Sequence, residues 1–113
     1  MVLDKDAIKR IQDRPIKTIT VPQWGGDVNI RVLSGREREI MEKEWENVKN
    51  SSASQRAWFA VLVTCDDDGN PLFDKSDIEW LSDKSGEALD VIFNEGMELN
   101  GIGKDAVEDA EKN

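Results

Sequence analysis

The sequence predicts a mainly α single domain with a small N-terminal β-hairpin (α+β), built around a compact helical core similar to a bundle. Three observations predict this class. The chain of 113 residues is long enough for one domain. Apolar residues alternate with polar ones between residues 19 and 32, whereas from residue 34 onward they recur at spacings of three and four. No internal repeat and no low-complexity linker divides the chain.

Within this one domain we expect four segments: 1–14 as a polar helix or arm, 15–33 as the hairpin, 34–101 as the helical core and 102–113 as a charged tail. In the first segment, residues 4–13 favour one short helix with Ile8 and Ile11 on one side. Pro15 ends this helix, because the residue before a proline is pushed out of the helical region.

Two runs of alternating residues flank a loop at 22–26 and predict the hairpin. Their apolar members are Ile19 and Val21 before the loop and Val28, Ile30 and Val32 after it. The glycines of the loop supply positive φ. Trp24 also lies in this loop. Its indole either folds back onto the hairpin and helices as part of the core, which we favour, or offers an aromatic anchor to a partner protein.

Ser34 and Glu37 have the spacing of a capping box, in which each side chain accepts a hydrogen bond from the other residue's backbone, so a helix is expected to begin there. Its apolar side comprises Ile40, Met41, Trp45 and Val48, while Glu42, Lys43, Glu44 and Glu46 face water. Residues 50–52 end it. A second helix over 54–64 is apolar nearly all round and is expected at the centre of the core. Its β-branched residues Val61, Val63 and Thr64 leave a strand as the alternative.

Two further helices are expected in the second half of the chain. Ser76 and Glu79 repeat the capping-box spacing and open a short helix. Residues 82–100 hold the clearest helical stripe, which consists of Leu89, Ile92, Phe93, Gly96 and Leu99. Each large apolar side chain of the stripe contributes about 1.5–3 kcal/mol on burial, before conformational entropy is counted. Gly101 follows where a left-handed C-cap belongs.

Residues 65–81 read CDDDGNPLFDKSDIEWL, and their acids raise the question of a cation site. Counted from Asp66, acids or amides occupy positions one, three, five, nine and twelve of a calcium loop. Position six requires a glycine for the sharp turn, and Pro71 stands there instead. Asp77 at position twelve is shorter than the glutamate needed. We interpret the stretch as a turn at 68–71 followed by a helix cap from Asp74 or Ser76, with no metal or cofactor.

The composition excludes several function classes. Acids outnumber bases by 24 to 15, and the net charge of −9 makes nucleic acid and anionic membranes poor partners. Without histidine, the chain cannot form a Ser-His-Asp or Cys-His catalytic arrangement. Cys65, the single cysteine, is expected as a small buried hydrophobe at a helix end. The longest apolar run, 57–63, falls short of the ~20 residues that span a bilayer. The start of the chain has no secretory pattern, so we expect a cytoplasmic protein. A chain this short has little room for a substrate cleft, so we expect no enzymatic activity.

Three stretches together resemble the tail assembly chaperones of long-tailed phages and prophages. The first is VPQWGGDVNIRVLSGREREIME at 21–42, which is similar to that family's V-P-x-W-G-G motif, short strand and R-x-L-S-x-x-E-R helix start. The second is CDDDGNPLFDKSDIEWLSDKS at 65–85, which is similar to the middle of the family's sequences. The third is LNGIGKDAVEDAEKN at 99–113, which resembles their closing segment. The first twenty residues carry no such resemblance.

The resemblance implies a role in virion morphogenesis. Members of the family keep the tape measure protein soluble in the host cytoplasm and help tail tube subunits assemble on it, and they are absent from the mature virion. Many self-associate, so a homo-oligomer is expected. In many, a programmed ribosomal frameshift yields a longer product. Here Glu111, Lys112 and Asn113 can be encoded by a run A AAA AAC, on which a −1 slip is expected.

An acidic protein with apolar grooves between its helices could cover the exposed apolar faces of a long helical partner. The candidate contact residues are Trp24 in the hairpin and Leu89, Ile92, Phe93 and Leu99 on the last helix. The alternatives are another phage or prophage interaction protein (a head–tail completion factor or a minor tail protein), an acidic inhibitor that mimics DNA, and a calcium-dependent or catalytic protein. A DNA mimic would array its carboxylates along one face, whereas here they cluster at caps and turns.

Overall fold

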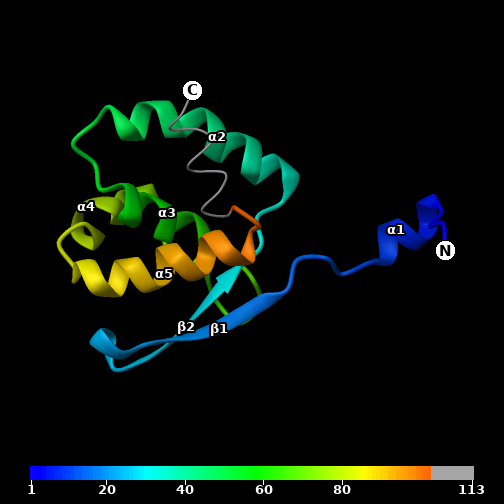
Figure 1. Ribbon diagram of the computed structural model, residues 1–113, viewed down its shortest axis with the longest axis horizontal. Helices are drawn as coiled ribbons and strands as arrows, with labels where there is room; N and C mark the ends of the chain where they lie inside the picture. The colour runs from blue at the N-terminus through cyan, green and yellow to red at the C-terminus, as the bar shows by residue number, and fades with distance from the viewer. Residues whose placement is uncertain (103–113) are drawn as a thin grey trace.

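The computed structural model describes residues 1–102 of the chain. A three-stranded antiparallel sheet lies against a group of helices (Figure 1). The strands are β1 (Ile16–Val21), β2 (Gly26–Arg31) and β3 (Thr64–Cys65), in the spatial order β1-β2-β3. The helices are α1 (Lys5–Arg10), α2 (Gly35–Lys49), α3 (Gln55–Val63), α4 (Ile78–Leu81) and α5 (Gly86–Leu99), with 3-10 turns η1 (Pro22–Trp24) and η2 (Lys75–Asp77).

The predicted α+β class is confirmed. Of the predicted charged tail, residues 103–113 lie outside the described part of the chain. No helix within residues 1–102 combines the length and the apolar character that crossing a bilayer requires.

The predicted hairpin is confirmed by the pairing of β1 with β2, from Ile16 opposite Arg31 to Val21 opposite Gly26. Its loop is a single 3-10 turn, η1, closed by Gly25 in the left-handed region at φ 69°. Glycine populates this region without steric cost, which explains its place in the loop. Inward-facing side chains of both strands, Val21 and Ile30 among them, are buried in the core.

The third strand corrects the expectation that the central helix runs through residue 64. Helix α3 ends at Val63, and Thr64 and Cys65 continue as β3, where they pair with Ile30 and Asn29 of β2. The physical reason is that β2 would otherwise present a second edge of unpaired backbone groups to its neighbours. Of the β-branched residues at 61–64, only Thr64 lies in a strand.

Helix α2 begins at the predicted capping box, which is confirmed. The Ser34 side chain accepts from the Glu37 N–H at 3.1 Å, and Glu37 Oε1 accepts from the Ser34 N–H at 2.9 Å. The predicted apolar side of this helix is wrong in part. Ile40 and Trp45 are exposed, whereas Glu44 is half-buried and accepts from the indole N–H of Trp58 at 3.1 Å. A largely buried indole N–H needs such an acceptor, and this need turns Glu44 inward.

Helix α3 is the centre of the core, as predicted, with six of its nine residues buried: Ala57, Trp58, Phe59, Ala60, Val61 and Val63. Helix α5 packs closely against it at Gly96. A Cβ at this glycine would lie 2.8 Å from Phe59 Cε1 and 3.1 Å from Val63 Cγ2. Only a residue without a side chain therefore allows the two helices to approach this closely.

The end of α5 is joined to the sheet by the buried side chain of Asn100. Its Oδ1 accepts from the Leu33 N–H at 2.8 Å, while its Nδ2 donates to the Arg31 carbonyl at 3.2 Å and the Gly96 carbonyl at 2.9 Å. Gly101 follows with φ 69°, which confirms the predicted left-handed cap. One amide thus satisfies three backbone groups that are excluded from water.

The N-terminal segment stands apart from this body. Helix α1, capped by Asp4 whose Oδ1 accepts from the Ala7 N–H at 2.8 Å, contains no buried residue. Figure 1 shows it projecting away from the sheet and the other helices. We call residues 1–14 the arm. The segment is a short helix on an extended connection, and the helix ends at Arg10, earlier than the predicted range of 4–13.

Candidate protein-binding surfaces

The five predicted contact residues have different environments in the structure. Leu89 is 3% exposed and Ile92 is 0% exposed, so both lie in the core facing α3 and β2 rather than at the surface. Phe93, Leu99 and Trp24 are half-buried and pack against the core. The structure brings four of the five together on α5 and places Trp24 apart from them, in the hairpin loop.

Trp24 forms one wall of an apolar groove of about 260 Å³. The groove is lined by one residue from η1, one from β2 and four from the second half of the chain: Trp24, Val28, Phe73, Trp80, Leu81 and Lys84. We call this the Trp24 groove. Water takes ~30 Å³ per molecule in the liquid, so the groove has room for one or two large side chains of a partner.

Trp80 is held in place on the far wall of the groove. Its indole Nε1 donates to Asp77 Oδ1 at 2.8 Å, and its ring meets Phe73 edge-on with 5.7 Å between the ring centroids. Lys84 Nζ lies 5.9 Å from the Trp80 ring centroid, in cation–π geometry. The Asp74 backbone N–H, followed by the Trp80 indole, holds the pKa of Asp77 below its usual range. The wall is therefore preorganised before any partner binds.

Sequence reasoning did not single out Phe73 and Trp80 as surface residues. Trp80 is 46% exposed, and Leu72 beside Phe73 is exposed as well. A tryptophan three residues after an aspartate within a helix start was the one available signal, because that spacing lets the indole bond the carboxylate.

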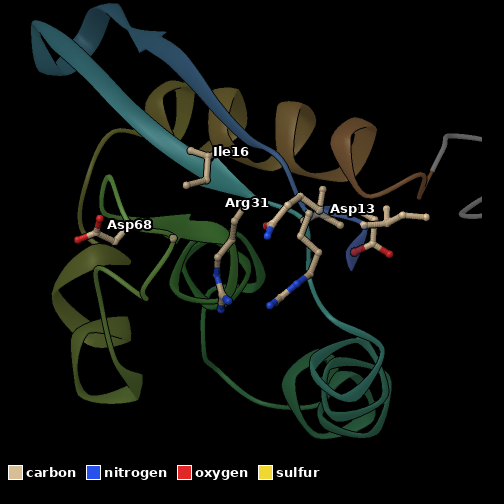
Figure 2. A pocket seen from close by; sticks show the side chains of 9 residues that line it. Asp13, Ile16, Arg31 and Asp68 are labelled. Carbon is tan, nitrogen blue, oxygen red and sulfur yellow. The ribbon is translucent and has the colours of Figure 1, made fainter. Parts of the chain in front are cut away.

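A second hollow, of about 360 Å³, lies where the arm joins the body. It is lined by the connection after α1, the ends of β1 and β2, and the acidic turn: Ile11, Gln12, Asp13, Arg14, Ile16, Arg31, Val32, Asp68 and Gly69. In Figure 2, Arg31 lies between Asp68 on one side and Asp13 on the other. The lining of this hollow is largely charged, whereas the lining of the Trp24 groove is mostly apolar.

The Arg31 guanidinium beneath this hollow is tied to the fold. It forms an ion pair of 2.7 Å with Glu37 and donates to the Leu62 carbonyl at 2.9 Å. Glu37 also pairs with Arg14 at 3.4 Å. Burial opposes the ionisation of Glu37, but the Ser34 N–H and Arg31 outweigh it and lower the pKa of this carboxyl. These contacts anchor the root of the arm and hold the side chains of Arg14, Arg31 and Glu37 within the fold.

The acidic stretch forms a turn, as interpreted, but the turn lies at 66–69 rather than at 68–71, because the Gly69 N–H donates to the Asp66 carbonyl at 3.1 Å. Asp66 Oδ1 accepts from the Asp68 N–H at 2.9 Å and the Asn70 N–H at 3.0 Å, and Gly69 has φ 85°. Pro71, at the glycine position of a calcium loop, instead forms an antiparallel bridge with Cys65. Within residues 1–102, no three acidic or cysteine side chains are grouped to hold a metal ion. The stretch is therefore a hairpin turn that follows β3.

The second capping box begins two residues earlier in the sequence than predicted. Asp74, not Ser76, is the cap: its Oδ1 accepts from the Ser76 N–H at 2.8 Å, and Asp77 Oδ2 accepts from the Asp74 N–H at 2.9 Å. The reason is that the 3-10 turn η2 precedes α4 and begins at Lys75. Asp74 was one of the two expected caps.

Cys65 is buried, as expected of a small hydrophobe, but it lies in β3 rather than at a helix end. Burial, reinforced by the neighbouring Asp66 and Asp67 and opposed by Arg31, raises the pKa of its thiol. A neutral, enclosed thiol is a poor nucleophile.

Comparison with known proteins gives one family. The family model described as phage tail assembly chaperone matches residues 7–113. Among solved structures, the chain is similar to the tail assembly chaperone of bacteriophage HK97, with a TM-score of 0.56 and 22% sequence identity over 80% of this chain and 85% of that one. This second likeness shows a shared fold.

Curated proteins with sequence similarity come from mammals. The amyloid-beta A4 precursor protein-binding family A member 1 is 30% identical in Rattus norvegicus and 29% identical in Homo sapiens, in each case over 102 residues and 89% of this chain. The chain spans 11% of the length of these relatives.

Proposed function

Because this chain belongs to the phage tail assembly chaperone family, we propose that it binds the tape measure protein of its phage or prophage and keeps it soluble. Tail tube subunits then assemble on the covered chain. The protein acts in the host cytoplasm and is absent from the mature virion. The observation that carries this proposal is the family match over residues 7–113, which spans the hairpin, the sheet and every helix of the body.

The surface of the body supports such a role. A net charge of −9 opposes aggregation of any complex that the protein coats. Large apolar side chains nevertheless remain exposed on the body: Ile40, Trp45, Leu72 and Trp80. Apolar side chains presented by helices bind the apolar face of another helix. The combination suits a protein that covers long helical partners in many copies.

We assign the tape measure contact to α2 and α5. Helix α2 has no buried residue, although it carries Ile40 and Trp45. Trp45 lies with its ring centroid 5.9 Å from that of Trp58 on α3, so it continues the core outward. On α5, Phe93 meets Phe59 edge-on at 5.3 Å, and the Arg56 guanidinium lies 5.0 Å from its ring. Leu89 and Ile92 support this surface from within the core.

Co-expression of the chain with the tape measure protein tests the proposal. We expect the wild-type chain to raise the soluble fraction of the tape measure protein several-fold and to co-purify with it. Trp45→Glu combined with Ile40→Glu is expected to abolish both effects, because a buried charge in an apolar contact is costly. Leu72→Glu, which places the same charge on an exposed leucine elsewhere, is the matched control.

Two outcomes separate the parts of this proposal. A tape measure protein that is equally insoluble with and without the wild-type chain contradicts the function. A soluble complex that persists with the double variant contradicts only the assignment to α2.

Self-association and frameshifting are further parts of the proposed function. The chain forms homo-oligomers, which light scattering of the purified protein tests. Glu111, Lys112 and Asn113 can be encoded by a −1 slippery run, which we propose is present in the gene. A run interrupted by AAG, with no open −1 frame beyond it, would exclude the longer product.

A further inference from the structure

The arm carries apolar side chains that the rest of residues 1–102 leaves exposed. Ile8 is 57% exposed and Ile11 is 46% exposed, and three more large apolar residues at the N-terminus are exposed: Met1, Val2 and Leu3. More than half of the large apolar side chains exposed within residues 1–102 lie at positions 1–16. A soluble protein rarely leaves such a cluster uncovered unless a partner binds it.

Helix α1 is too short to be stable by itself. It has six residues and no buried side chain, and its cap at Asp4 satisfies one of its orphan N–H groups. Isolated helices of fewer than about 12 residues are marginal in water, because nucleation fixes several residues for one hydrogen bond. Packing of Ile8 in α1, and of Ile11 just after its end, against an apolar surface would supply the missing stabilisation.

The charge of the arm is opposite to that of the body. Residues 1–14 contain four bases and three acids, for a net charge of +1, whereas residues 15–113 contain eleven bases and twenty-one acids, for a net charge of −10. Helix α1 carries three basic side chains, Lys5 at its start and Lys9 and Arg10 in its last turn. The arm is thus attracted to the body of the protein, and this attraction is weakened by salt.

The Trp24 groove has the matching properties. Five of its six lining residues are apolar and the sixth is Lys84, and an acid lies beside each tryptophan: Asp77 accepts from Trp80, and Glu87 accepts at 3.4 Å from Gln23, the residue before Trp24. Two isoleucines from a short helix would fill the groove, and lysines beside them would meet these carboxylates. An apolar pocket with charged residues around it is a typical binding centre.

The groove of the same molecule is out of reach of its own arm. The arm enters β1 at Ile16, which pairs with Arg31, whereas Trp24 lies beyond Val21 at the other end of the hairpin. Six strand residues span roughly 20 Å, and residues 11–15 would have to reverse direction to cover that length. Figure 1 shows α1 on the opposite side of the molecule from the hairpin loop.

We propose that the arm of one copy docks in the Trp24 groove of a second copy, with Ile8 and Ile11 against Trp24, Phe73 and Trp80. The contact rests on the proposed self-association and gives it a mechanism. It joins two different surfaces, so each copy offers one arm and one groove, and copies connect head to tail into a ring or an open chain.

Light scattering coupled to size-exclusion chromatography tests this contact with two variants of the full chain. Ile8→Glu combined with Ile11→Glu disables the arm, and Trp80→Glu disables the groove. We expect each variant alone to elute at the 12.8 kDa monomer mass, while the wild type forms larger species. An equimolar mixture of the two variants is expected to give a dimer of twice that mass, because one intact arm and one intact groove remain. Ala53→Glu, which places the same charge at an exposed position between α2 and α3, is the control and keeps the wild-type mass.

A peptide of residues 1–14 provides a measurement that does not depend on how Trp80→Glu folds. Added in excess to the wild-type chain, the peptide is expected to lower the oligomer mass, and the same peptide with Ile8→Glu and Ile11→Glu is expected to have no effect. Variants that keep the wild-type mass, or a mixture that stays monomeric, would overturn the arm contact while leaving self-association in place. A wild-type chain that is monomeric at ~100 μM overturns both the arm contact and the proposed self-association. The tape measure assay tests the proposed function separately.

Discussion

Asn100 accepts a hydrogen bond from the backbone N–H of Leu33 at 2.8 Å, across 67 positions of the sequence. This buried contact closes the end of α5 onto the segment between β2 and α2. It holds together the two halves of the chain, between which the apolar core is built.

Asn100→Ala is expected to destabilise the protein by about 1–3 kcal/mol, because the Leu33 N–H and the Arg31 carbonyl lose the amide that bonds them. Urea denaturation followed by tryptophan fluorescence measures the change. Asn50→Ala is the matched control. Asn50 is also the C-cap of a helix, but its amide donates to the Glu46 carbonyl at an exposed site. Equal losses for the two variants would contradict the role of Asn100.

Gly96→Ala is expected to cost about 1–3 kcal/mol, although alanine favours helices more than glycine does. The new Cβ would lie 2.8 Å from Phe59 Cε1, so a buried ring has to move. Gly86→Ala, at the start of the same helix, meets no atom within 4 Å and is expected to be neutral or slightly stabilising. Thermal unfolding of the two variants gives the comparison, and a stabilised Gly96→Ala protein would show that the packing is looser than described.

The ion pair between Glu37 and Arg31 predicts a dependence of stability on pH. The pKa of Glu37 is lower in the folded protein than its ordinary value of 4.5. Its contribution is therefore fully present above pH 4.5 and is lost as the pH falls through the folded-state pKa. Glu37→Gln is expected to be less stable than the wild type at pH 7, with a difference that shrinks below pH 4.5. Glu39→Gln, on the exposed side of the same helix, serves as the control. A difference that is constant between pH 7 and pH 3 would contradict the ion pair.

Cys65 is expected to resist alkylation in the native protein. Burial in β3 raises the pKa of its thiol and hides it from reagent, so iodoacetamide at pH 8 should react many-fold more slowly than after denaturation in urea. Mass spectrometry follows the labelled fraction. Rapid labelling of the folded chain would mean that β3 opens readily from the sheet.

Elements that depend only on residues close together in the sequence were predictable. The capping box of Ser34 and Glu37 and the hairpin loop with Gly25 are local, and both occur where expected. The strand at Thr64 was not predictable with certainty, because it exists only through its pairing with Ile30, which is distant in the sequence. The cap at Asp74 depended on a 3-10 turn that the spacing of Ser76 and Glu79 does not reveal.

The candidate site was predictable only in its parts. Leu89 and Ile92 were recognised as an apolar stripe, but periodicity cannot tell a stripe that faces the core from one that faces a partner. Trp24 was singled out by its place in a loop. The groove beside it needed Phe73 and Trp80, which the fold brings from the second half of the chain.

The central claim is that this protein keeps a tape measure protein soluble. The most direct measurement dilutes the purified tape measure protein out of urea, with and without an equimolar amount of the purified chain, and follows aggregation by light scattering. The account predicts that the wild-type chain suppresses scattering and elutes with the tape measure protein, whereas the Ile40→Glu and Trp45→Glu double variant does neither. Scattering unchanged by the wild-type chain, with the two proteins eluting apart, would contradict it.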